Sequence, residues 1–227
     1  MKSNIAFLGF LLALLLPGAL PGMCAVDQPV VGSPENSAPV PSLAEKITID
    51  GYPAKWDAIA ALPTANPKQS AGMVKLAWRE DGLYGCMQVK DDPIDIDLQN
   101  PWSKDCVEIW LDTDFARSAQ MGENDYQIVM APASPTLDGK SLVVIPQGLM
   151  DEDAITAKTK INKDGFTIEF FIPVKLIPPA KMAKGTKIGF DYSVDLKGKS
   201  VESFFGAKTA AGGYIKPSTW GAIELVK

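Results

Sequence analysis

Apolar and polar side chains alternate in short runs along most of the chain beyond residue 45. A period of two is typical of β-strands that bury one face, and the Asp-Gly and Pro residues between the runs favour turns. The runs predict strands at 46–50, 73–80, 82–91, 106–112, 126–132, 141–146, 154–162, 165–173, 187–196 and 220–226. Only 174–183 favours a helical turn. We therefore expect an all-β chain that folds as one antiparallel two-sheet β-sandwich, jelly-roll-like in form.

The alternation also predicts which side chains leave the core. In 106–112, Val107, Ile109 and Leu111 form one side, so Glu108 and Trp110 lie on the other. The same reasoning places Tyr84, Gln88, Glu169, Asp191, Ser193 and Asp195 on second faces of their strands. A solvated face would carry mostly Lys, Glu and Thr. Rings mixed with carboxylates and amides instead indicate a wetted binding surface.

The first residues have the form of a secretory signal peptide. A single charge at Lys2 precedes an apolar run over 5–16, and this run is shorter than the roughly 20 residues that span a bilayer. We expect a signal peptide over 1–25 and a secreted or periplasmic protein with no transmembrane segment. Cys24 could carry a lipid, but Met23 stands where a small residue would be usual, so free secretion is favoured.

A flexible, Pro-rich leader is expected over 26–44, because this stretch lacks an apolar period. The sandwich would then occupy 45–227. The whole chain carries a net charge of −5, and the loss of Lys2 would make it one unit more negative. An acidic chain without a basic cluster argues against nucleic acid and anionic membranes as partners.

Histidine is absent from the chain. This removes the usual base of Ser-His-Asp and Cys-His catalysis, and also the commonest zinc and haem ligand. A glycosidase needs only two carboxylates, and Glu108 with Glu169 or Asp191 could form such a pair. Nothing in the sequence marks one of them as protonated, so we expect no enzyme.

Two cysteines, Cys86 and Cys106, remain after the expected processing. On adjacent strands in an oxidising compartment they could pair, whereas two buried free thiols explain the pattern equally well. The sequence leaves both alternatives open.

Trp102 lies between Pro101 and Ser103, directly before a predicted strand, and Glu108 follows six residues later. Sugar binding combines a flat ring against the C–H face of a pyranose with fixed polar groups for its hydroxyls. This spacing suits a ring at a rim and an acceptor within a groove. The alternative is structural: Trp102 packs over the end of the sandwich and Glu108 pairs with Lys90.

Four aspartates lie within seven residues in the stretch DDPIDIDLQ (91–99). Loop carboxylates of this kind can hold calcium, and Asp91, Asp92 and Asp95 are the candidate ligands of a possible structural ion. The stretch lacks the glycine and bidentate glutamate of an EF-hand loop. A solvated acidic loop is the alternative.

The order of motifs resembles family 9 carbohydrate-binding modules. It comprises ITIDGYPAKWD (47–57), LAWREDGLYGCMQVKDD (76–92), PWSKDCVEIWLDTD (101–114), DGFTIEFFIP (164–173), GTKIGFDYSVD (185–195) and WGAIEL (220–225). Its most specific part is W-x-x-D-x-V-E, here Trp102, Asp105, Val107 and Glu108. The resemblance implies a sandwich whose concave face receives sugar, Trp102 as one stacking ring, Glu108 as a hydroxyl acceptor, and bound calcium.

The second ring stays open between Tyr214, Phe204 and Trp220, the last in a position that more often packs the core. Members of this family tend to carry a polar Asn where this chain has Met130 and Ala131. A lost or changed ligand is therefore an alternative.

The expected function is that of an exported, non-catalytic domain that binds a glycan or oligosaccharide. The candidate contacts are Trp102, Glu108, Tyr84, Gln88, Trp110, Arg79, Glu169 and Tyr214. Haem-binding domains of the same superfamily can ligate iron by Met and Lys, which keeps Met87, Met121, Met130 and Lys90 as an alternative. A third possibility is an adaptor domain that contacts a protein partner in a surface assembly.

Overall fold

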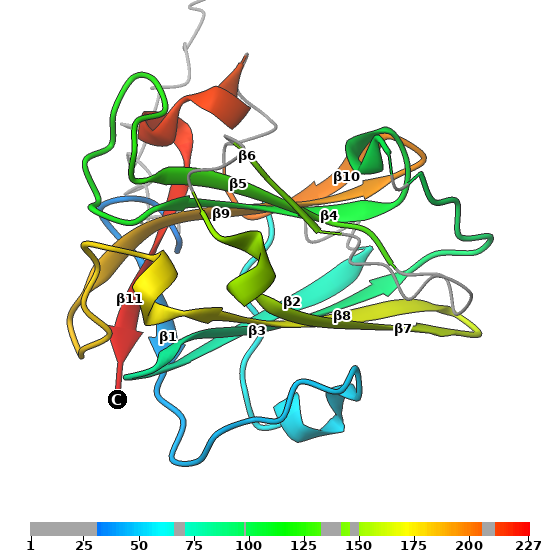
Figure 1. The fold of residues 1–227 in the computed structure, drawn as a ribbon, viewed down its shortest axis with the longest axis horizontal. Coiled ribbons are helices and arrows are strands. Elements are labelled where there is room, and N and C mark those ends of the chain that lie inside the picture. Colours follow the sequence, from blue (N-terminus) through cyan, green and yellow to red (C-terminus); the bar gives the residue numbers. More distant parts are fainter. Residues whose placement is uncertain (1–30, 66–70, 98, 133–141, 146–149, 206–211) are drawn as a thin grey trace, which may run out of the picture.

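The computed structural model describes residues 31–65, 71–97, 99–132, 142–145, 150–205 and 212–227. Within these ranges the chain consists of β-strands joined by loops and short 3-10 turns, and it contains no α-helix. The strands form two sheets that lie face to face (Figure 1). The predicted all-β sandwich is confirmed.

The larger sheet has the strand order β1-β11-β9-β4-β5-β6, with β10 added against β9. Its members are β1 (Ala38–Pro41), β4 (Cys106–Asp112), β5 (Asp125–Met130), β6 (Leu142–Ile145), β9 (Lys187–Leu196), β10 (Lys199–Ser203) and β11 (Gly221–Val226). The pairs are antiparallel except that β1 runs parallel to β11. In the centre of the sheet, β4 lies between β9 and β5.

The smaller sheet has the order β2-β3-β8-β7 and is antiparallel throughout. Its strands are β2 (Gly72–Arg79), β3 (Gly82–Lys90), β7 (Thr156–Asn162) and β8 (Gly165–Pro173). The remaining elements are the 3-10 turns η1 (Pro53–Trp56), η3 (Pro101–Ser103), η4 (Glu152–Ala154), η5 (Val174–Leu176), η6 (Gly213–Ile215) and η7 (Pro217–Thr219). The turn η5 lies where the sequence favours a helical turn.

The space between the sheets is filled by the side chains that the alternation assigned to the core. Val107, Ile109 and Leu111 of β4 are fully buried, as are Phe166 and Phe170 of β8. The opposite side chains of these strands lie on the outer faces of the sandwich. Each sheet therefore has one core face and one outer face, and function depends on what covers each outer face.

The outer face of the smaller sheet is covered by the segment 43–59, which includes η1 (Figure 1). The sequence predicted a strand at 46–50, and this prediction is wrong. Ile47 and Ile49 do alternate with polar residues, but they pack over Trp56 and Tyr84 instead of pairing with a neighbouring strand. Alternation of apolar and polar residues thus shows that one side of a segment is buried, but it does not show that the segment pairs with a strand.

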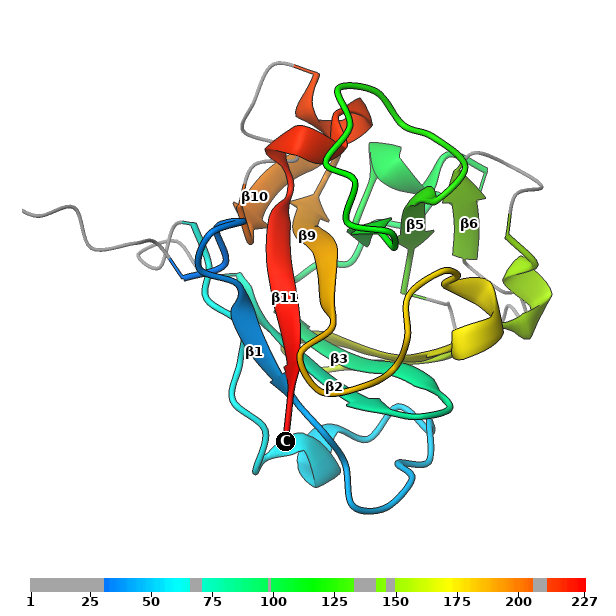
Figure 2. The ribbon, with the colours of Figure 1, turned by 90° about the vertical axis from the view of Figure 1, so that its left-hand side faces the viewer.

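The leader predicted over 26–44 needs a correction as well. Residues Ala38–Pro41 form β1, and Ala38 and Val40 are fully buried against the edge of the larger sheet. Short apolar residues between prolines suffice because an edge strand needs its N–H groups on one side only. Figure 2 shows β1 beside β11, close to the marked C-terminus.

Cys86 and Cys106 are free and buried. Cys86 lies on the outer face of the smaller sheet, and Cys106 on that of the larger sheet, so the disulfide alternative is wrong. The predicted signal peptide and Cys24 lie outside the described residues. Within the described part of the chain, no helix is long and apolar enough to cross a membrane.

Candidate functional site

The outer face of the larger sheet carries a row of polar side chains over β4, β5 and β9. These are Cys106, Glu108, Gln127, Ser193 and Asp195, all of them buried or nearly so. They reach one face because β4 pairs with β9 so that Cys106 lies opposite Asp195 and Glu108 opposite Ser193. A few polar groups fixed side by side on one face are what lets a binding site orient a ligand and select its hydroxyls.

Glu108 is held by Gln127, whose side-chain nitrogen donates a hydrogen bond of 2.6 Å to its Oε2. Glu108 is 0% exposed and Gln127 is 8% exposed. Beside them the Ser193 hydroxyl donates to Asp195 at 2.5 Å and lies 2.7 Å from the Ser200 hydroxyl. The alternative in which Glu108 pairs with Lys90 is wrong, because Lys90 is exposed at the end of β3 in the other sheet.

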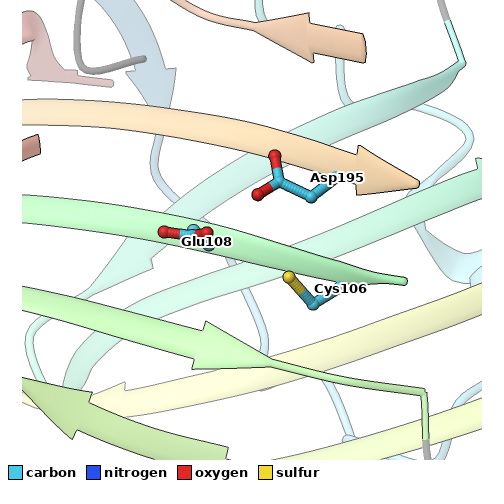
Figure 3. A group of neighbouring side chains, drawn as sticks. All are labelled: Cys106, Glu108 and Asp195. Carbon is cyan, nitrogen blue, oxygen red and sulfur yellow. The ribbon is translucent and has the colours of Figure 1, made fainter. Parts of the chain in front are cut away.

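Cys106, Glu108 and Asp195 bring one sulfur and two carboxylates to within 4.8 Å of one another (Figure 3). Calcium takes oxygen ligands, and a thiolate suits softer ions such as zinc. This group therefore does not fit the calcium that the family resemblance implies. Its three side chains also take part in the polar row described above.

Trp102 lies on the turn η3, immediately before β4, and its side chain is 43% exposed. Asp105 holds this turn in place, because its carboxylate accepts hydrogen bonds from the backbone nitrogens of Asp95 and Lys197. Gly198 has a φ of +71°, and a Cβ there would lie 2.6 Å from the carbonyl oxygen of Ser103. The β9–β10 turn can thus pack against η3 only with glycine at this position.

Tyr214 lies on the turn η6 and is 48% exposed. Its neighbour Gly213 is fixed by the indole nitrogen of Trp220, which donates to the Gly213 carbonyl at 2.8 Å. Trp220 itself is fully buried against Trp110, with Met121 alongside. Of the three candidates for a second ring, Trp220 therefore supports the turn and Phe204 lies in the core between the sheets, whereas Tyr214 is exposed.

Arg117 fastens the segment that follows η6. Its guanidinium donates to the backbone carbonyls of Ser218, Trp220 and Gly221 at 2.5 to 3.1 Å. The backbone nitrogen of Arg117 in turn donates to Asp112 at the end of β4. The loop after β4 and the segment before β11 are therefore tied together over the outer face of the larger sheet.

Both exposed rings belong to turns on the same side of the molecule. Figure 1 shows η3 near β10 and the orange-red turns η6 and η7 at the other end, all beyond the outer face of the larger sheet. Figure 2 agrees, with η6 and η7 in front and η3 behind. The polar row thus lies on a sheet face that is flanked at its two ends by turns that each carry an exposed aromatic ring.

Five predicted contact residues lie elsewhere or serve another purpose. Tyr84 and Glu169 are buried beneath the segment 43–59, on the outer face of the smaller sheet. Burial raises the pKa of the Tyr84 hydroxyl, which donates to Asp81. Glu169 accepts from Trp56 and from the backbone of Gly51. None of these side chains shares a face with Glu108.

Gln88 lies on the outer face of the smaller sheet too, opposite Met73 and Thr167. Arg79 at the end of β2 donates to the carbonyls of Leu43 and Ala44 and so fastens the start of the covering segment. Trp110 does lie on the same face of β4 as Glu108, but it is fully buried under Trp220. The prediction that Trp110 contacts ligand is wrong for this arrangement.

The three predicted calcium ligands do not converge. Asp95 pairs with Lys104 at 2.6 Å, while Asp91 lies beside Asp105. Burial, together with the neighbouring Asp105 carboxylate, raises the pKa of Asp91 to about 6. Asp92 is exposed. Among the described residues, the group that gathers closely enough to share an ion is the one in Figure 3 and not this loop.

The methionines and lysine of the haem alternative are also spread apart. Met87 and Met130 lie in the core, whereas Met121 packs over Trp110 on an outer face. Lys90 is exposed on β3, three residues after the buried Met87. A Met–Lys pair of haem ligands would have to share one cavity, and Lys90 lies on an outer face while Met87 and Met130 face the core.

Sequence reasoning missed Gln127, although a signal was present. The prediction for β5 considered Met130 and Ala131, and the alternation that buries Ile128 and Met130 places Gln127 on the outer face. Gln127 supplies the polar side chain that β5 seemed to lack. Ser193 and Asp195 had been placed on a second face, and the register with β4 brings them to Glu108.

Fold and site together define a β-sandwich module with one polar sheet face between two exposed rings. Residues 52–227 match the family model described as "Carbohydrate family 9 binding domain-like", so the chain belongs to this family. The resemblance seen in the motifs is confirmed.

The similar curated proteins are much longer than this chain. Endo-1,4-beta-xylanase A of Thermotoga neapolitana is 27% identical over 165 residues, which cover 70% of this chain and 14% of the xylanase. Endo-1,4-beta-xylanase C of Paenibacillus barcinonensis is 23% identical over 79% of this chain and 16% of its own length. The match therefore involves a small part of each xylanase.

Two solved structures of a family 9 carbohydrate-binding module from Caldicellulosiruptor kristjanssonii share the fold. The complex with cellotriose has a TM-score of 0.65 at 22% identity and covers 83% of this chain and 93% of the other. The complex with glucose has the same TM-score and identity, and it covers 82% of this chain and 95% of the other. At this identity the similarity establishes the architecture.

Proposed function

We propose that this protein is an exported, non-catalytic carbohydrate-binding module that receives a sugar on the outer face of the larger sheet. The observation that carries the proposal is the polar row over β4, β5 and β9, flanked by the turns of Trp102 and Tyr214. Family membership and the sugar-bound modules with the same fold support it. The signal-like residues 1–25 support export.

The rings and the polar row would have different tasks. An exposed aromatic ring covers the C–H face of a pyranose, which removes apolar surface from water. Buried polar groups at the floor then select hydroxyls, since leaving such groups unpaired costs free energy. This division agrees with Trp102 being 43% exposed while the polar side chains of the row are buried.

Gln127 is the group through which the floor would meet a hydroxyl. Glu108 is 0% exposed and already accepts from the Gln127 amide. That hydrogen bond fixes the orientation of the amide and leaves its carbonyl oxygen and second N–H for a ligand. In this proposal Glu108 acts by positioning Gln127. It accepts a sugar hydroxyl directly only when the ligand displaces the Gln127 amide from its carboxylate.

Isothermal titration calorimetry with cellotriose tests the proposal. Trp102→Ala should weaken binding by about 1–3 kcal/mol, the usual contribution of a buried aromatic contact at a binding site. Tyr52→Ala is the matched control, because Tyr52 is 57% exposed on the covering segment of the other sheet. Equal affinities for the wild type and a folded Trp102→Ala variant would refute the stacking role.

A glycan array tests the class of ligand. We expect signals from oligosaccharides with unbranched pyranose chains or chain ends that fit between two rings. An array without any binding, obtained with folded protein, would overturn the proposed function and leave a protein partner as the better explanation.

A further inference from the structure

A hollow lies on the outer face of the smaller sheet, on the side of the sandwich away from the polar row. Its volume is about 280 Å³, and its lining includes Met73, Gln88, Lys90, Asn162, Asp164 and Thr167. The segment 43–59 covers the part of this face around Tyr84 and Glu169. The hollow occupies the part beyond it, where β3 ends and β7 turns into β8.

A glycine occupies the middle of the last row of this face, next to the hollow. In the sheet register Gly165 lies directly between Lys90 of β3 and Asn162 of β7. Its φ is +144°, and a Cβ there would lie 1.9 Å from the carbonyl oxygen of Val89. The close pairing with β3 therefore requires glycine at the middle position, and only Lys90 and Asn162 contribute side chains to this row.

The next row of the sheet supplies polar groups that the protein itself does not use. Gln88 lies opposite Thr167, and Thr167 is 2% exposed. Among the described residues, neither the Gln88 amide nor the Thr167 hydroxyl has a hydrogen-bond partner. Gln88 is half-buried, and neither group is among the fully buried polar atoms, so both remain available to a ligand that donates to or accepts from them.

The rim of the hollow carries one charge of each sign and an apolar side chain. Lys90 and Asp164 oppose each other in charge, while Asn162 accepts from the Asp164 backbone nitrogen at 3.0 Å. Met73 is 47% exposed and adds an apolar wall. The two opposite charges of the rim cancel, and the other lining groups are uncharged donors and acceptors beside a small apolar surface. This combination favours a neutral ligand with several hydroxyls.

We propose that this hollow is a second carbohydrate site, which holds one neutral sugar unit against Gln88 and Thr167. A volume of about 280 Å³ lies at the lower end of the range for ligand pockets, so the hollow suits a single ring. This site is separate from the proposed site on the larger sheet. The module would then contact glycan on both outer faces of the sandwich.

Titration of ¹⁵N-labelled protein with glucose, followed by two-dimensional NMR, tests the second site. We expect saturable shifts of the backbone amides of residues 88–90 and 162–167, both in the wild type and in Trp102→Ala. Thr167→Val removes the hydroxyl at nearly constant volume. It should raise the apparent Kd for glucose, fitted from these shifts, about fivefold, which is the usual contribution of one hydrogen bond. Gln88→Met should have a similar effect.

Thr156→Val is the matched control, since Thr156 is an exposed threonine of β7 outside the hollow. It should leave the titration unchanged. Absence of saturable shifts at 88–90 and 162–167, or their loss in Trp102→Ala, would overturn the proposal. Equal shifts with sodium acetate or glycine would also overturn it, because Lys90 and Asp164 would then be attracting ions. Glucose binding here without any binding near Trp102 would instead refute the first site alone.

Discussion

The indole nitrogen of Trp56 lies 2.7 Å from the carboxylate of Glu169, and both side chains are fully buried. The same carboxylate accepts hydrogen bonds from the backbone nitrogens of Asp50 and Gly51, and Lys55 lies 3.1 Å away. Glu169 therefore fastens the covering segment to the smaller sheet. A side chain that looked like a ligand contact in the sequence is a structural anchor.

Replacement of this anchor should lower stability and leave sugar binding unchanged. Glu169→Ala removes the acceptor of three N–H groups and leaves Lys55 with Asp50 as its remaining carboxylate partner, so the free energy of unfolding should fall by about 3 kcal/mol. Urea denaturation measures this change. Glu45→Ala, at an exposed position of the same segment, should change stability by less than about 0.5 kcal/mol. A loss of cellotriose affinity in folded Glu169→Ala would contradict the anchor role.

Arg117→Lys should weaken sugar binding at the larger sheet, although Arg117 itself is not proposed to contact the sugar. A lysine cannot reach the carbonyls of Ser218, Trp220 and Gly221 together, so the segment that carries Tyr214 would be less well fixed. We expect about a fivefold loss in cellotriose affinity, equivalent to about 1 kcal/mol. Arg79→Lys is the control, because Arg79 fastens the other outer face, and it should bind normally in calorimetry.

Asp112 should make stability depend on pH. Burial raises the pKa of Asp112 from its ordinary 3.8 to about 6, with Asp114 and Asp125 nearby adding to the effect. The folded state then holds its proton more tightly than the unfolded state, so stability decreases as pH rises from about 4 to about 6 and is level above that.

Urea titrations at a series of pH values measure this dependence. The contribution of Asp112 should amount to about 3 kcal/mol, and it should be missing in Asp112→Asn. The comparison concerns slopes, because Asp112→Asn also weakens the bonds to Ala116 and Arg117 at every pH. Parallel curves for the two proteins between pH 4 and 6 would show that Asp112 does not titrate in this window.

The two buried thiols should stay unreactive in the folded protein. Cys86 and Cys106 lie on outer faces of different sheets, and burial raises the pKa of Cys86 to about 12, so almost no thiolate forms at neutral pH. Ellman's reagent should label both residues only after denaturation. Dithiothreitol should leave the melting temperature unchanged, and a drop of several degrees would indicate a disulfide after all.

Local patterns predicted the strands well but could not assign each strand to a sheet. Glu108 and Glu169 look alike in the sequence, since each alternates with large apolar residues on a central strand. They lie on opposite outer faces because β4 pairs with β9 and β8 pairs with β3. Strand partners depend on contacts distant in sequence, which alternation does not report.

The candidate site was predictable where its residues belong to one short motif. Trp102 and Glu108 were found because a turn and a strand separated by a few residues must lie close together. Tyr214 was one of several rings, and only the bond between Trp220 and Gly213 distinguishes it from those that pack inside. Trp110 was misassigned because alternation places its side chain on the outer face of β4 but cannot show that Trp220 covers it there.

The pairing of β1 with β11 has a consequence for how the chain folds. Ala38 lies beside Ile223, so the two partner strands are separated by most of the sandwich in sequence. Contacts between residues this distant along the chain form late in folding, because the intervening chain must first lose conformational entropy. β1 can therefore complete the edge of the larger sheet only once β11 is in place, which makes this edge a late step in the folding of the sandwich.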